Sequence, residues 1–229
     1  MKRFFCFFLM LGSVLITEAQ NTITAPNLGD LPLWSPERNR NNRKTEGSPF
    51  LLKQFVNATI YLDRNKAIAN IPANLDLENN EIVVLDEKKK LFAISVPVYR
   101  VVFEDETTGQ ERTVLSGLPA IDKQTEKSYY ELLHPGKTNL LKVITLYWSE
   151  SRAYHEAVPT RKYEQSPTYY IYNDSRGMIK LPKSPQDIPV AINAQQAGKL
   201  SKLVQEHQLN LKTETDLIKL MDLYNTSDY

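Results

Sequence analysis

Hydrophobic and polar residues alternate along the middle of the chain, from Phe50 to about Leu181. Between Val56 and Leu62, apolar residues occupy every second position, which gives a half-buried strand one apolar face. Further short runs of this kind are separated by turn signals such as Asn79-Asn80, Thr108-Gly109 and His134-Pro135-Gly136. Short strands at this spacing predict an antiparallel meander that forms a sandwich or a partly closed barrel.

The hydrophobic period changes after Pro189, where apolar residues begin to recur at helical spacing. Thr213 to Asp216 has the hydroxyl and carboxylate spacing of a capping box. The helix that it begins has one apolar face, formed by Leu217, Ile218, Met221 and Tyr224. We therefore expect a mainly β (α+β) chain. Its β-rich body spans residues 48–189, and two short amphipathic helices in a tail, residues 190–229, pack on that body.

The first twenty residues have the pattern of a secretory signal peptide. Lys2 and Arg3 precede an unbroken apolar run from Phe4 to Ile16, and small residues stand at the −3 and −1 positions of a cleavage site after Ala19. The run is shorter than the roughly 20 residues with which a helix crosses a bilayer, and no later segment of that length lacks a charge. We expect export, and no transmembrane segment in the mature chain.

Residues 21–47 are rich in asparagine, proline and arginine and follow neither the strand period nor the helix period. We expect them to form a flexible linker between the signal peptide, residues 1–20, and the domain. The alternative is a partner-binding peptide anchored by Trp34.

The composition, 41% hydrophobic and 24% charged, is that of one ordinary globular domain. The formal net charge of +1 falls to zero when the signal peptide is removed, so no basic field favours a nucleic-acid partner. Cys6, the single cysteine, lies inside the signal peptide. The mature chain therefore has no disulfide, no thiol nucleophile and no cysteine-based metal site.

Four ordered motifs carry a resemblance to a known family: Gly47 to Phe50, Tyr129 to Lys142, Tyr169 to Ile171, and Lys212 to Asn225. Together they resemble a family of exported bacterial proteins of unknown function. The resemblance implies a signal peptide, a β-rich body and a helical tail, and it implies no activity.

Residues with catalytic or metal-binding chemistry are scattered. His134, His155 and His207 lack the spacing of metal ligands, and strand alternation places His155 on the face opposite its neighbour Glu156. Ser116 lacks the first glycine of a nucleophile elbow. Carboxylates pair mainly at hairpin tips, where charge keeps strand edges soluble. We expect no catalytic residue, no metal and no cofactor.

Aromatic residues gather on the last strands of the body. Amphipathic rings suit a sugar, peptide or protein surface, so these rings are the candidate binding residues. The alternative is that they pack in the core under the terminal helices. The candidates are Tyr147, Trp148, Tyr169, Tyr170 and Tyr172.

These observations predict an exported, non-enzymatic protein with a binding or scaffolding role, located in the periplasm, at the cell envelope or outside the cell. Its partner would be a protein or carbohydrate of the envelope. The alternative is a secreted hydrolase with an unrecognised carboxylate or His155 site. A concave pocket with converging polar groups would favour the hydrolase.

Overall fold

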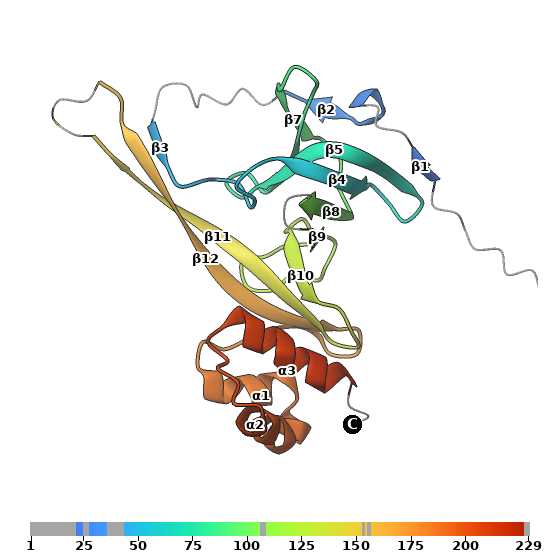
Figure 1. The fold of residues 1–229 in the computed structure, drawn as a ribbon, viewed down its shortest axis with the longest axis vertical. Helices are drawn as coiled ribbons and strands as arrows, with labels where there is room; N and C mark the ends of the chain where they lie inside the picture. The colour runs from blue at the N-terminus through green and yellow to red at the C-terminus, as the bar shows by residue number, and fades with distance from the viewer. Residues whose placement is uncertain are drawn as a thin grey trace, which may run out of the picture.

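The computed structural model describes residues 22–24, 28–35, 44–105, 109–152, 154 and 157–226. Within these residues the chain is mainly β, as predicted: thirteen strands form one large, mostly antiparallel sheet that does not close on itself, and short helices follow at the C-terminal end (Figure 1). The strand order along the sheet is β13-β12-β11-β10-β9-β8-β4-β5-β6-β7-β2. Apart from the pairs β8–β4 and β7–β2, this order follows a meander, because the other neighbours along it are also neighbours in sequence.

Six strands with a common hydrophobic core make up the upper part of the sheet in Figure 1. Ile60, Ile68 and Phe103 are fully buried in this core. Asn80 has a φ of 54° in the turn between two of the strands, which is the positive φ expected of the Asn79-Asn80 pair. The strands are β4 (Val56–Tyr61), β5 (Lys66–Asp76), β6 (Glu81–Leu85), β7 (Leu91–Ile94), β8 (Arg100–Asp105) and β9 (Gln110–Leu115).

Part of the N-terminal segment adds three short strands to different places on this sheet. β1 (Thr22–Thr24) pairs in parallel with β5, β2 (Leu33–Trp34) pairs antiparallel with β7, and β3 (Lys44–Glu46) pairs in parallel with β12. Leu31, just after the short 3-10 helix η1 (Leu28–Asp30), is only 5% exposed and belongs to the upper core. The described residues of the expected linker, 22–24, 28–35 and 44–47, therefore include strands that pair with the sheet, whereas its residues 21, 25–27 and 36–43 lie outside the described residues.

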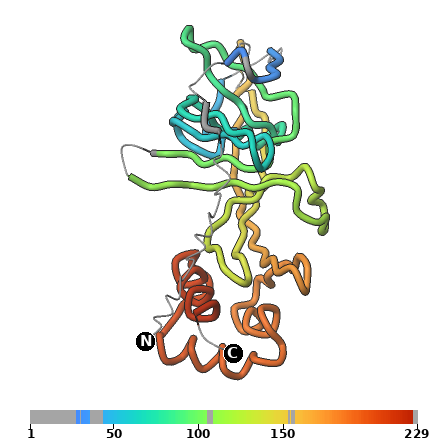
Figure 2. Tube along the Cα trace, turned by 90° about the vertical axis from the view of Figure 1, so that its right-hand side faces the viewer, coloured from blue at the N-terminus to red at the C-terminus, as the bar shows by residue number. Residues whose placement is uncertain are grey.

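The last four strands descend from the upper core to the helices (Figures 1 and 2). Two of them form a long hairpin whose cross-strand pairs run from Asn139↔Tyr172 to Ser151↔Thr160. Leu140 and Ile171, near its lower end, pack against the helices. The strands are β10 (Tyr130–His134), β11 (Asn139–Ser151), β12 (Thr160–Asn173) and β13 (Gly177–Lys180).

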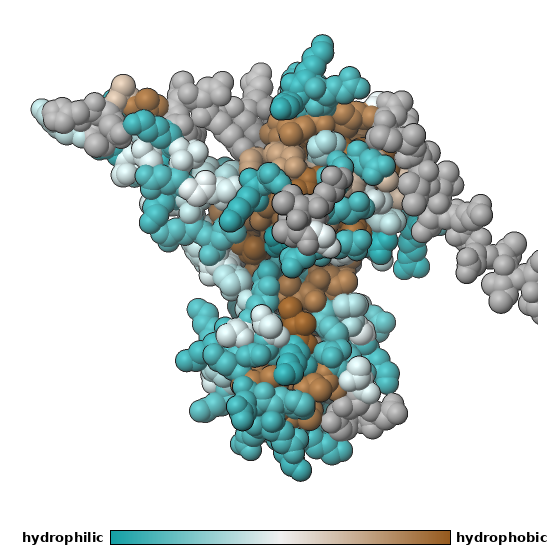
Figure 3. Space-filling model, viewed as in Figure 1, coloured by the Kyte–Doolittle hydropathy of each residue, from teal (hydrophilic) through white to brown (hydrophobic). Residues whose placement is uncertain are grey.

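Three α-helices complete the described chain, where two were predicted. The additional helix α1 (Ile188–Ile192) contains Pro189 in its first turn, where a missing N–H costs no helical hydrogen bond. α2 (Ala197–Glu206) and α3 (Glu214–Thr226) are the predicted pair, and the 3-10 turns η2 (Pro185–Asp187) and η3 (Ala194–Gln196) precede α1 and α2. The helical part is largely hydrophilic outside, with apolar atoms visible at its junction with the sheet (Figure 3). No described helix combines the length and apolar character required to cross a membrane.

The sequence signal for the start of α3 is confirmed in part. The Thr213 hydroxyl accepts a hydrogen bond from the Asp216 N–H at 3.3 Å, as a capping box requires. The Asp216 carboxylate instead accepts from the N–H of Asn210, at 3.0 Å. The buried face of α3 is formed by Leu217, Leu220 and Met221.

Candidate functional site

The five aromatic side chains predicted to bind a partner lie at two ends of the β11–β12 hairpin. Tyr147 and Trp148 lie in its outer part, and they are 60% and 52% exposed. Tyr169, Tyr170 and Tyr172 lie in its inner part, beside the helices and β10. The structure therefore does not bring the five together in one surface.

Tyr170 is a core residue, 2% exposed. Its ring meets the buried ring of Tyr130 edge to face, with centroids 5.7 Å apart and planes at 86°. Tyr172 is half-buried against the same small cluster, which includes Leu141 and Val143. For these two tyrosines the structure favours core packing over a binding surface.

We call the outer part of the hairpin the arm, defined as Thr145–Ser151 of β11 and Thr160–Ser166 of β12. It projects from the body at the upper left of Figure 1. Tyr147 lies directly opposite Glu164, and Trp148 lies opposite Tyr163. Because successive side chains of a strand point to opposite faces, the two exposed aromatic rings lie on opposite faces of the arm.

Arg161 fixes the arm to the body. Its guanidinium lies over the Trp148 ring, 3.9 Å from the ring centroid. The same guanidinium pairs with Glu78 of the body at 2.7 Å and with Glu150 of the arm at 3.2 Å. Glu78 also accepts a hydrogen bond from the Tyr163 hydroxyl at 3.0 Å. These contacts connect the outer half of the arm to the turn that follows β5, so the arm is tied to the body near its outer end.

A buried charge network lies at the other end of the hairpin. Glu131 on β10 is paired with Arg112 on β9 at 2.6 Å and with Lys142 on β11 at 2.8 Å. Lys142 also pairs with Glu214, at the start of α3, at 2.9 Å, and the Tyr169 hydroxyl donates to the same carboxylate at 3.1 Å. Glu131 and Lys142 are only 7% and 8% exposed. The network joins four strands to α3.

The protonation states of this network follow from its contacts. Burial by itself raises the pKa of Glu131, but the hydrogen bonds and charges of Arg112 and Lys142 outweigh burial and hold that pKa below the ordinary value. Burial, together with the neighbouring negative charge of Glu214, raises the pKa of Tyr169 to about 12. Tyr169 therefore stays protonated and donates to Glu214, and the described charges satisfy one another. We interpret the network as a structural clamp.

Sequence reasoning did not identify this network. The sequence does contain a signal for it. Glu131 and Lys142 are charged residues within otherwise apolar strand segments, at positions whose side chains the strand alternation directs into the interior. Charged residues at such positions are almost never fully buried unless they are paired.

The histidines do not form a site within the described residues. His134 lies 3.9 Å from a carboxylate oxygen of Asp222, and His207 is exposed at the end of α2. His155 lies outside the described residues. The described part of the chain holds no group of three or more His, Cys, Asp or Glu side chains that would bind a metal ion.

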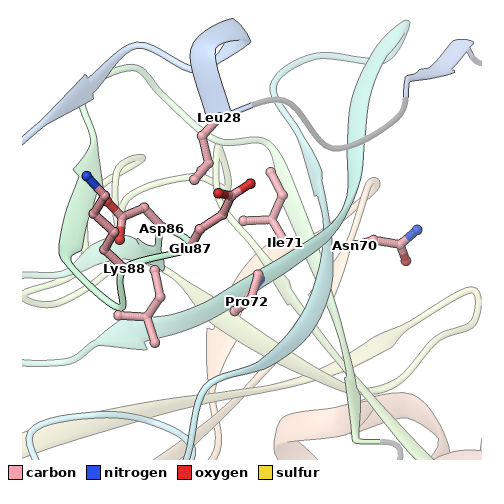
Figure 4. Close-up of a pocket in the computed structure, with 8 residues that line it drawn as sticks. Leu28, Asn70, Ile71, Pro72, Asp86, Glu87 and Lys88 are labelled. Atoms are coloured by element: carbon pink, nitrogen blue, oxygen red, sulfur yellow. The ribbon is translucent and has the colours of Figure 1, made fainter.

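An open hollow of about 490 Å³ lies on the upper sheet (Figure 4). Its polar groups do not converge: the Asn70 side chain points away from the labelled acidic loop, and the Asp86 carboxylate accepts from the N–H of Lys90 in its own turn, at 2.7 Å. The hollow therefore does not provide the converging polar groups that would favour a hydrolase. It is lined by Leu28, Asn70, Ile71, Pro72, Leu85, Asp86, Glu87 and Lys88.

Comparisons with protein-family models, with curated proteins and with solved structures find no match to this chain. The resemblance to exported bacterial proteins consequently rests on the sequence motifs alone. The arm is the candidate site because it presents exposed aromatic rings and is tied to the body through Arg161.

Proposed function

We propose that this chain is an exported, non-enzymatic protein that binds a partner protein at the cell envelope through the arm. The observation that carries the proposal is the pair of exposed rings, Tyr147 and Trp148, on a hairpin that projects from the body. Exposed aromatic residues with a polar tip are enriched in protein interfaces, where they act as anchors.

A protein partner suits the arm better than a single sugar. Tyr147 and Trp148 point to opposite faces, so one saccharide ring cannot stack on both. A polypeptide surface can wrap around a projecting hairpin and cover both faces. The contacts of Arg161 with Glu78, Glu150 and Trp148 orient the arm before binding, which lowers the entropy lost on association.

Loss of both exposed rings is expected to weaken partner binding about 30-fold or more, the effect of removing an interface anchor of about 2 kcal/mol. The test is capture from envelope extracts with the immobilised protein, comparing the parent with a Tyr147→Ala, Trp148→Ala double variant. Tyr99→Ala is the matched control, because Tyr99 is 45% exposed outside the arm.

Three results would contradict this function. The double variant could capture the same partners as strongly as the parent, or the captured material could survive protease treatment of the extract and be a polysaccharide. The third is a measurable turnover that His155→Ala abolishes, which would establish the hydrolase alternative.

Export is expected to remove residues 1–19 or 1–20, because small residues precede the cleavage site and the apolar run is too short to remain as an anchor. N-terminal sequencing of the protein from the envelope or culture fraction should begin at Gln20 or Asn21. A protein recovered there with Met1 still in place would disprove cleavage.

A further inference from the structure

One edge of the arm lacks a neighbouring strand among the described residues. β11 pairs with β12 along its whole length, but on its other side β10 reaches only Leu140 to Lys142. Beyond that point, no backbone pairing within the described chain reaches the outer side of Thr145–Ser149. We call these five residues the open edge.

The open edge has none of the features that protect exposed strands from pairing. Natural edge strands carry charges, proline or bulges on their outer side. The open edge reads Thr-Leu-Tyr-Trp-Ser, without a charge, proline or glycine, and Thr145, Tyr147 and Trp148 are of types that favour β structure. The adjacent strand β12 does carry such residues, namely Lys162, Glu164 and Pro167.

The opposite edge of the same hairpin already accepts an added strand. β3 pairs in parallel with Thr160–Lys162 of β12. The backbone of Gly47, which follows β3, lies so close to the Tyr163 carbonyl that a Cβ atom would stand 2.7 Å from that oxygen. The arm is thus extended by strand addition on one side.

We propose that the open edge pairs with the open edge of a second copy of this chain, in antiparallel orientation, so that the two arms form one continuous sheet. This inference rests on the proposed function and names the partner protein of the arm. A two-fold axis at the midpoint of the open edge places Tyr147 beside the same tyrosine of the second copy. The five residues carry no charge, so pairing the two copies brings no like charges together. Two-fold pairing of identical surfaces is also the commonest symmetry of soluble oligomers.

A charge exchange at Tyr147 tests the pairing. Sedimentation of the purified protein across the micromolar range should show a dimer. Tyr147→Lys and Tyr147→Glu should each weaken the dimer about tenfold or more, because like charges meet at the axis and an aromatic pair is lost. An equimolar mixture of the two variants should recover dimers that contain one copy of each.

Ser166→Lys is the matched control, because Ser166 is exposed on the same face of the neighbouring strand β12 and lies opposite Thr145. It should leave the dimer unchanged. Each variant should unfold thermally at the same temperature as the parent, which would confirm that it is folded. We expect this because Tyr147 is 60% exposed and Ser166 is also exposed.

The inference is overturned if the parent is a monomer, if both charged variants remain dimers, if their mixture stays monomeric, or if Ser166→Lys dissociates the dimer. A monomeric parent that still captures an envelope protein through Trp148 would overturn this inference and leave the proposed function standing. A dimer that captures no other protein would support the inference and identify self-assembly as the role of the arm.

Discussion

Deletion of residues 212–229 is expected to unfold the whole domain. The deleted segment contains α3, whose Leu217, Leu220 and Met221 are at most 3% exposed against the sheet and the other helices. Burial of an aliphatic side chain contributes about 1.5–3 kcal/mol. The three side chains together therefore approach the roughly 5–15 kcal/mol of stability that a typical domain has.

The deletion also removes polar contacts between the C-terminal segment and the inner end of the β11–β12 hairpin. Glu214 pairs with Lys142, and the Asn225 side chain accepts from the N–H of Thr138 and donates to its carbonyl oxygen, both at 3.0 Å. Without Glu214, the Lys142 ammonium keeps only the carboxylate of Glu131 among its described partners. The deletion therefore costs buried apolar area and leaves part of the charge network unbalanced.

Thermal and denaturant unfolding followed by circular dichroism measures this effect. Leu220→Ala is a milder version that should cost about 2–5 kcal/mol, because Leu220 is fully buried. Val190→Ala is the matched control; Val190 is 53% exposed on α1, so its loss should change stability by less than about 0.5 kcal/mol. A truncated protein that melts at the parent temperature would contradict the role assigned to α3.

Glu131→Gln is expected to destabilise the fold by about 3–5 kcal/mol, the cost of removing one member of a buried ion pair. The substitution preserves shape but leaves Lys142, which is 8% exposed, with Glu214 as its remaining described carboxylate. Denaturant unfolding measures the difference. Glu164→Gln is the control: Glu164 pairs with Lys162 on the exposed arm, and loss of a surface pair should cost at most about 1 kcal/mol.

The contribution of Glu131 should also depend on pH. Its pKa is lower in the folded state than in the unfolded chain, so the unfolded state binds the proton more readily. The stabilisation is therefore fully present above the ordinary glutamate pKa of about 4.3 and is lost as the pH falls through that value towards the folded pKa. The stability gap between the parent and Glu131→Gln should narrow on acidification, and a constant gap would show that Glu131 acts through packing alone.

Features that depend on neighbouring residues could be predicted from the sequence alone. Period-two alternation located the strands of the body, and the change to helical spacing located α2 and α3. The Asn79-Asn80 pair marked a turn with a positive φ, and Thr213 marked the start of α3. These features follow from backbone sterics and local hydrogen bonds, which a few consecutive residues specify.

The folded structure was needed to show which side chains are covered. Tyr147 and Tyr170 both stand in strands rich in aromatic residues, yet one is 60% exposed and the other 2%. Alternation assigns each to a face, but β10, whose Tyr130 covers Tyr170, reaches only the inner end of the hairpin. The pairing of Lys142 with Glu214 likewise spans 72 residues. Burial and long-range ion pairing depend on residues that are distant in the chain. A local sequence pattern contains information only about residues that are close together in the chain.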